Sequence, residues 1–128
     1  MTLIKITVKG EPDVSPFTKT FQYSTKTDEQ IFDNLVNMVK DKLDRNLRIN
    51  INEAITAFSA LVVSEFKENK SVEQIQKNAS ILLKPEQVMI GVPETIQQMS
   101  FEVTLDGTKR QVVLNTPIRI SDYILKSA

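Results

Sequence analysis

The sequence predicts an α+β fold. The prediction is three to four helices, a C-terminal β-hairpin and an extra N-terminal β-hairpin, with both hairpins sharing one small antiparallel sheet. Two observations lead to it. Apolar and polar residues alternate near both ends of the chain, which is typical of half-buried strands. Between these ends, apolar residues recur at helical spacing after residues that commonly cap helices. The length of 128 residues fits a single domain over residues 1–128.

The first element is predicted to be a β-hairpin over residues 1–25. Ile4, Ile6 and Val8 alternate with polar residues, and residues 17–25 repeat the alternation after the turn-rich stretch GEPDVSP. An isolated hairpin is only marginally stable in water. We therefore expect these strands to join the sheet of the C-terminal hairpin. The alternative is that they mediate self-association or replace a contact with a partner.

Three capping patterns predict where the central helices begin. In each, a residue with a side-chain oxygen is followed three positions later by Glu or Gln. The first predicted helix covers about residues 28–46, the second ends near residue 68, and the third ends near residue 79. The predicted N-caps are Thr27, Asn50 and Ser71. The apolar stripe of the first helix is predicted to comprise Ile31, Phe32, Leu35, Val36, Val39 and Leu43.

The stretch EQVMIGVPETI, residues 86–96, places a glycine and a proline in an otherwise helix-like run. Pro85 suits a first helical position, and Gly91 suits a left-handed C-terminal cap. Pro93 should prevent the helix from resuming. We expect a helix of one to two turns, whose apolar residues either pack in the core or form a rigid docking surface. The interface candidates here are Val88, Met89, Val92, Pro93 and Ile96.

The clearest hairpin prediction covers MSFEVTLDGTKRQVVLN. Phe101 begins the alternation, and Asp106-Gly107 is a favoured two-residue turn because both positions tolerate positive φ. Phe101, Asp106 and Gly107 are further interface candidates, and the alternative for them is a simple hairpin without a partner.

Composition narrows the classes of function. Lys plus Arg and Asp plus Glu number 16 each, so no basic stripe favours nucleic acid or an anionic membrane. No apolar run approaches the ~20 residues that span a bilayer, and a cytoplasmic protein is expected. The chain has no His and no Cys, which excludes Ser–His and Cys–His nucleophile pairs and makes a transition-metal site unfavourable. Carboxylates such as Glu53, Glu65, Glu86 and Glu94 remain, and we interpret them as caps or solvated residues.

Three motifs resemble the urease gamma subunit family. EQVMIGVPETI is similar to the family's E-Q-V-M-x-G-V-P-E-M-I, and LRININEA is similar to L-K-L-N-Y-P-E-A. LDGTKRQVVLNTPI resembles P-D-G-T-K-L-V-T-V-H-E-P-I. The order and spacing of the motifs make the resemblance specific. Departures from it are Asn52, which stands where Pro is common, and Asn115-Thr116, which replace His-Glu.

The resemblance implies a gamma-like region over residues 26–118, followed by a tail over residues 119–128. It implies a noncatalytic structural subunit that assembles with beta-type and alpha-type chains of a urease, whose nickel lies in the alpha chain. No cofactor, metal site or catalytic residue is then expected in this chain. The alternatives are a stand-alone gamma-like interaction module that forms homo-oligomers without urease activity, and a small enzyme that uses carboxylates.

Overall fold

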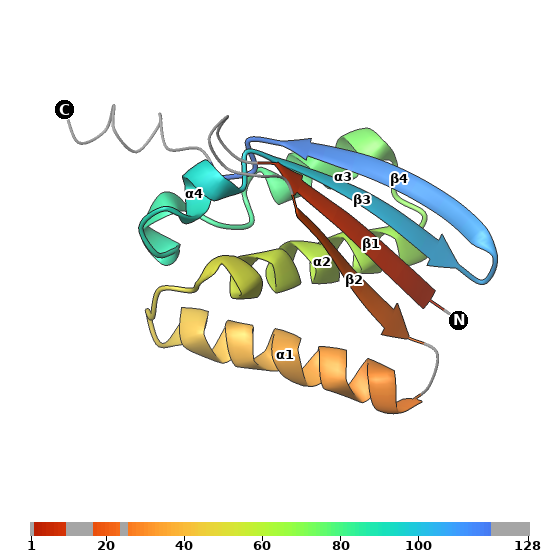
Figure 1. Ribbon diagram of the computed structural model, residues 1–128, viewed down its shortest axis with the longest axis horizontal. Helices are drawn as coiled ribbons and strands as arrows, with labels where there is room; N and C mark the ends of the chain where they lie inside the picture. Colours follow the sequence, from red (N-terminus) through yellow and green to blue (C-terminus); the bar gives the residue numbers. More distant parts are fainter. Residues whose placement is uncertain (1, 10–16, 24–25, 119–128) are drawn as a thin grey trace.

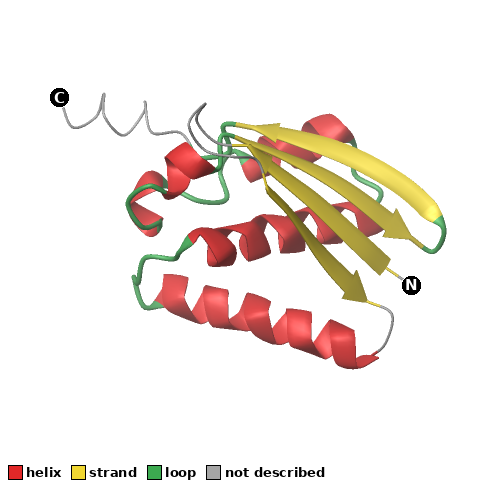
Figure 2. Ribbon diagram, in the orientation of Figure 1, coloured by secondary structure: helices red, strands yellow, loops and turns green. Residues whose placement is uncertain are grey.

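A layer of helices covers one face of an antiparallel sheet (Figures 1 and 2). The computed structural model describes residues 2–9, 17–23 and 26–118. The strands are β1 (Thr2–Lys9), β2 (Phe17–Tyr23), β3 (Gln98–Leu105) and β4 (Thr108–Asn115). The helices are α1 (Lys26–Asp44), α2 (Ile51–Lys67), α3 (Val72–Ala79) and α4 (Val92–Thr95), with a short 3₁₀ helix, η1 (Pro85–Gln87). The predicted α+β class is confirmed.

The two hairpins form one sheet in the strand order β2-β1-β3-β4. β1 pairs antiparallel with β2 on one side and with β3 on the other. Its register with β3 runs without a break from Thr2↔Leu105 to Lys9↔Gln98. The predicted joining of the N-terminal hairpin to the C-terminal sheet is therefore confirmed, and β1 is an interior strand (Figure 1).

The inner face of the sheet forms half of the hydrophobic core. Ile4, Ile6 and Val8 of β1 are 0% exposed, and Phe101 of β3 is paired directly with Ile6. The helices cover this face one beside another: α1 contacts β2, α2 contacts β3 and α3 contacts β4. The opposite face is mostly polar, as in antiparallel sheets that have one side in water, although Val113 of β4 is exposed there. The ion pair between Lys109 and Glu102, at 3.0 Å, lies there.

Helix α1 begins earlier than predicted, and its buried stripe is narrower. Lys26 is already helical, so Thr27 lies inside the first turn and does not serve as the N-cap, contrary to the prediction. Ile31 is 56% exposed and Leu35 is 39% exposed, although both were assigned to the buried stripe. The reason is that α1 lies at the border of the helical layer, beside α2 and β2, so that only one side of the helix is covered. Phe32 and Val39 are buried on that side.

Side chains cap the next two helices. The Asn50 Oδ1 accepts a hydrogen bond from the Glu53 backbone N–H at 2.9 Å, and the Asn50 N–H donates to the Glu53 Oε1 at 3.0 Å. These two reciprocal hydrogen bonds satisfy the backbone N–H groups of Asn50 and Glu53, which would otherwise have no partner within the helix. The Ser71 Oγ accepts from the Gln74 N–H at 3.2 Å at the start of α3. None of the described helices combines the length and the apolarity that a membrane span requires.

Candidate subunit interface

The 86–96 segment is fastened to the fold at its first residues. Val88 forms a parallel β-bridge with Ile49, which lies in the loop between α1 and α2. The Ile49 N–H donates to the Gln87 carbonyl at 3.0 Å, and the Met89 N–H donates to the Ile49 carbonyl at 2.9 Å. Val88 and Ile49 are both buried in the core. The backbone hydrogen bonds of Gln87 and Met89 and the buried side chain of Val88 therefore hold this part of the segment against the fold.

The helix predicted over this segment is replaced by two shorter ones. η1 ends at Gln87, and α4 begins at Val92, directly after Gly91. Gly91 has a left-handed backbone with φ of 92°, but it is the N-cap of α4 and not the C-terminal cap of a preceding helix. Pro93 lies in the first turn of α4, so the prediction that it prevents a further helix is wrong. The physical reason is that a first-turn residue has no intrahelical use for its N–H, which proline lacks.

Most of the candidate residues belong to the core of this chain. Those that are buried are Val88, Val92, Pro93, Ile96 and Phe101. In contrast, Met89 is 45% exposed, and Ile90, which was not among the candidates, is 95% exposed. Alternation at the β-bridge explains Met89, because the residue after a buried Val88 points outward, whereas Ile90 is exposed because it lies in the turn that leads to Gly91. The segment therefore presents the Met89-Ile90 pair to solvent on a backbone that buried neighbours hold in place.

The turn of the β3–β4 hairpin lies at the other end of the sheet. Asp106 and Gly107 are exposed and have φ of 48° and 85°. β3 begins at Gln98, close to α4, and runs away from it over 8 residues. At ~3.3 Å per residue, this separates the turn from α4 by roughly 23 Å, as Figure 1 shows with α4 and the turn at opposite ends. The predicted candidates do not form one continuous surface.

Glu94 in α4 has a carboxylate oxygen without a donor. Its Oε2 atom is buried, and no hydrogen-bond partner for it exists among the described residues. A buried acceptor that is left unpaired costs free energy, so such an atom requires an explanation. It lies in the same short segment as the exposed Met89-Ile90 pair.

Of the other carboxylates singled out in the sequence, Glu53 and Glu65 have structural partners, whereas Glu86 is exposed. Burial raises the pKa of Glu53, but the hydrogen bonds from Lys42 and the Asn50 N–H outweigh it and hold that pKa below its usual value. Glu65 is only 4% exposed, so its interpretation as a cap or solvated residue is wrong. Its carboxylate accepts hydrogen bonds from Lys70 and Asn78, which hold its pKa below the usual range. Within the described residues, no three Asp or Glu side chains cluster closely enough to hold a metal ion.

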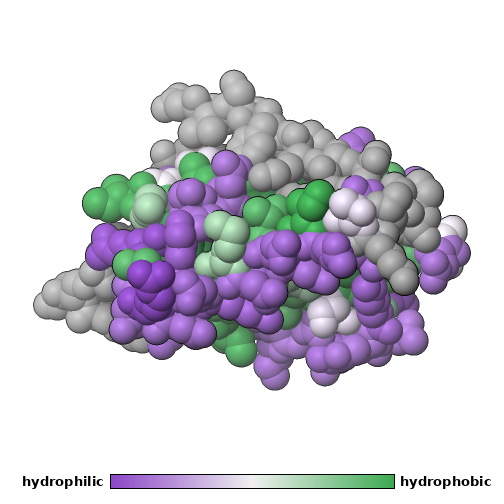
Figure 3. Space-filling model, turned by 90° about the horizontal axis from the view of Figure 1, so that it is seen from below, coloured by the Kyte–Doolittle hydropathy of each residue, from purple (hydrophilic) through white to green (hydrophobic). Residues whose placement is uncertain are grey.

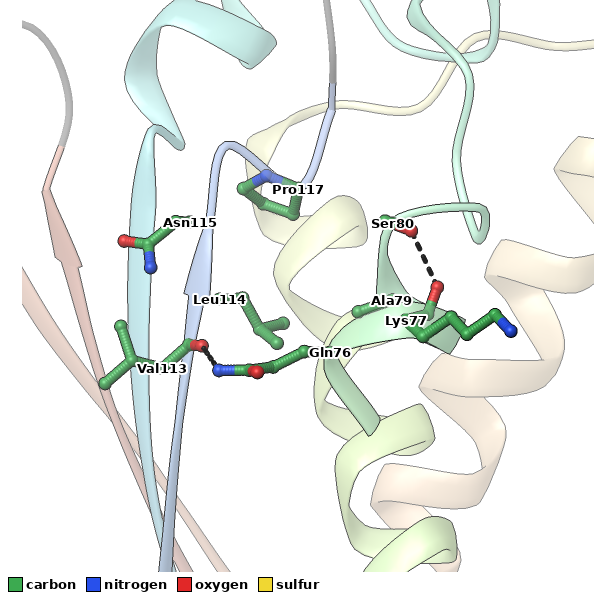
Figure 4. A pocket seen from close by; sticks show the side chains of 8 residues that line it. All are labelled: Gln76, Lys77, Ala79, Ser80, Val113, Leu114, Asn115 and Pro117. Atoms are coloured by element: carbon green, nitrogen blue, oxygen red, sulfur yellow. Dashed lines mark hydrogen bonds between the residues drawn. The ribbon is translucent and has the colours of Figure 1, made fainter. Parts of the chain in front are cut away.

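A shallow pocket of about 370 Å³ separates α3 from β4 (Figure 4). Its lining includes Gln76, Ser80 and Pro117. The Gln76 Nε2 donates to the Val113 carbonyl at 2.8 Å, so a side chain of α3 covers one acceptor on the outer edge of β4. The lining of the pocket contains no pair of acidic or nucleophilic side chains suited to catalysis, and the Gln76 hydrogen bond attaches α3 to the sheet there.

A second exposed apolar group lies on α1. Ile31 and Leu35, which were assigned to the buried stripe, and Met38, which was not, follow one another at helical spacing, and Met38 is 60% exposed. Figure 3 views the molecule from the side of α1 and shows a mostly hydrophilic surface with separate hydrophobic patches. Sequence periodicity detects this stripe, but it does not distinguish a stripe that faces the core from one that faces solvent.

Comparisons with known proteins agree on one family. Residues 22–118 match the family described as "Urease, gamma subunit". The urease subunit gamma of Halalkalibacterium halodurans is 33% identical over 82 residues, which cover 64% of this chain and 82% of the relative. The subunit of the same name from Prochlorococcus marinus strain MIT 9313 is 39% identical over 83 residues, with the same two coverages. That from Synechococcus sp. strain CC9605 is 36% identical over 83 residues, again covering 64% of this chain and 82% of the relative.

Proposed function

The chain belongs to the urease gamma subunit family, and we propose that it is a noncatalytic structural subunit that assembles with the beta and alpha chains of a urease. The match over residues 22–118 is the observation that carries this proposal. The residue types support it, since the chain has no imidazole and no thiolate to bind nickel. In the proposed complex the alpha chain holds the nickel and hydrolyses urea, and this chain contributes shape and contacts.

The 86–96 segment is the proposed docking surface. Ile90 and Met89 offer apolar area that the fold leaves in water, whereas Val92 and Ile96 fix the backbone beside them. A rigid apolar anchor loses little conformational entropy on binding, which favours affinity.

A second candidate function is a stand-alone gamma-like interaction module that self-associates without urease activity. One observation favours it: β1 and most of β2 lie outside residues 22–118, yet they form half of the sheet. A family member with an additional hairpin has a surface different from that of its relatives, and the difference could exclude their partners.

Affinity purification from the native host separates the two candidates. A tagged full-length chain is expected to recover beta-type and alpha-type urease chains, identified by mass spectrometry, together with stoichiometric nickel and urea hydrolysis. Recovery of this chain alone, as a homo-oligomer by light scattering, would favour the second candidate. Hydrolysis of urea by the isolated chain would contradict both.

Two matched variants test the docking surface. Ile90→Asp should abolish recovery of the other chains, because it places a charge on the proposed anchor. Ile81→Asp serves as the control, since Ile81 is 76% exposed but lies outside the 86–96 segment. Both substitutions are at exposed positions and should change the free energy of unfolding by no more than about 0.5 kcal/mol. Equal recovery with both variants would place the interface elsewhere.

A further inference from the structure

One edge of β3, which lies within the family match, pairs with β1, which lies outside it. The family match begins at residue 22, so all of β1 lies before it, whereas β3 and β4 lie within it. Without β1, the β3 edge would present a row of unpaired backbone groups over 8 residues. Such an edge is a template for pairing with another extended chain.

The two edges of the β3–β4 hairpin have different hydrogen-bond partners. On the β4 side, the Gln76 side chain already binds the Val113 carbonyl at 2.8 Å, and α3 lies beside the strand (Figure 4). On the β3 side, the acceptor and donor groups are taken by the backbone of β1 alone, in an unbroken antiparallel register. The β3 edge therefore has the complete hydrogen-bonding pattern that an added strand requires.

The side chains of β1 show what such a strand must carry. Ile4, Ile6 and Val8 project to the inner face and are 0% exposed, so the site has three consecutive aliphatic positions at a spacing of two residues. Lys5 and Thr7 face the polar side, where Lys5 is exposed. Specificity would come from the inner positions, whereas the outer positions tolerate polar residues.

We infer that the β3 edge is a strand-acceptor site for an extended segment with aliphatic residues at alternate positions, and that β1 occupies this site in cis. The covalent connection gives β1 an effective concentration on the order of millimolar, which excludes a similar segment from another chain. The kind of partner that fits is thus a protein with an exposed strand of the pattern Ile-x-Ile-x-Val. In the intact chain this contact is made within the molecule and not between molecules. The inference does not depend on whether a urease complex forms.

The test separates β1 from the rest of the full-length protein without removing it. A specific protease sequence is inserted after Asp13, and the purified chain is cleaved so that β1 is held only by its strand pairs. A fluorescent peptide of residues 1–10 is then added in excess, and its incorporation is followed by anisotropy. The expected result is that the peptide enters the cleaved chain and is excluded from the uncleaved chain.

Two control peptides report on the inner positions. A peptide with Ile4→Ser, Ile6→Ser and Val8→Ser should bind more than about a hundredfold more weakly, because it loses three buried aliphatic groups. A peptide with Lys5→Ser and Thr7→Ser should bind about as well as the original. Equal binding of both peptides, or equal entry into cleaved and uncleaved chains, would overturn the inference. Unfolding or aggregation of the cleaved chain would also overturn it, since β1 would then be inseparable from the core.

A locked variant gives an independent measurement in the same protein. Thr7 and Ser100 are direct partners across β1 and β3, and the chain contains no cysteine. With Thr7→Cys and Ser100→Cys, the oxidised cleaved chain should exclude the labelled peptide and the reduced one should admit it. Entry under oxidising conditions, with the disulfide verified by mass spectrometry, would show that the peptide binds somewhere other than the β3 edge.

Discussion

Position 91 favours glycine because its backbone is left-handed, and not because a side chain would lack space there. Its φ is 92°, and a Cβ atom built on it would meet nothing within 4 Å. Gly91→Ala should therefore lower the free energy of unfolding by about 1–2 kcal/mol, because only the unfavourable left-handed backbone contributes. Urea denaturation measures the change. Gly91→Asn is the matched control and should cost less than alanine, since Asn tolerates positive φ better. An alanine variant of unchanged stability would contradict the backbone conformation.

Glu65 links α2 to the start and the end of α3 through a buried carboxylate. It accepts hydrogen bonds from Lys70, just before α3, and from Asn78 in its last turn. The Lys70 ammonium and then the Asn78 amide hold the pKa of Glu65 below its value in the unfolded chain. The unfolded state therefore binds a proton more readily than the folded state. The resulting stabilisation is fully present above the unfolded pKa of ~4.3 and is lost as the pH falls through the lower, folded pKa.

Glu65→Gln tests this linkage. At neutral pH the variant should lose about 1–3 kcal/mol, because hydrogen bonds to a charged carboxylate are replaced by weaker ones. Below the folded pKa the wild type should approach the variant, so the difference in urea midpoint shrinks with acid. The exposed Glu86→Gln is the control and should show little difference across the range. A difference that stays constant with pH would show that the Glu65 charge is not what stabilises the fold.

At the scale of elements, a capping residue matters only if it lies outside its helix. Asn50 precedes α2 and exchanges two hydrogen bonds with Glu53, whereas Thr27 lies within α1. Asn50→Ala should lower the free energy of unfolding by about 1 kcal/mol. Thr27→Ala should leave it unchanged or raise it slightly, because alanine has the higher helix propensity. Chemical denaturation of both variants decides between the two roles, and equal losses would contradict the observed start of α1.

Local sequence patterns predicted correctly which segments are helices and strands, but they did not predict correctly which faces of the helices are buried. Alternation identified β1, β3 and β4, since each strand has one buried and one polar face, as in Ile4, Lys5 and Ile6. Helical periodicity found α1 but assigned Ile31 to the core, because periodicity does not reveal how many neighbours a helix has. The same limit applies to the candidate interface. Composition marked the 86–96 segment as apolar, but only the bridge to Ile49 and the turn at Ile90 show which of its residues point outward.

At the scale of the whole molecule, the N-terminal strand β1 pairs with β3 in the middle of the sheet. β1 and β3 are separated by most of the sequence, and their pairing places Ile6 directly beside Phe101. This contact cannot be read from either strand alone, since many pairings satisfy the same alternation. It has the consequence that the N-terminal hairpin is part of the common core and that the helices pack on both hairpins, α1 on β2, α2 on β3 and α3 on β4.

The covalent chain should therefore unfold as one unit. Ile6→Ala removes a side chain that is 0% exposed and should lower the free energy of unfolding by about 2–5 kcal/mol. Thr7→Ala, on the polar face of the same strand, should change it by no more than about 0.5 kcal/mol. Because the core is shared, hydrogen exchange in α2 and in β4 should accelerate together with exchange in β1 in the Ile6→Ala variant. Faster exchange confined to β1 and β2 would mean that the hairpin opens separately from the remaining fold.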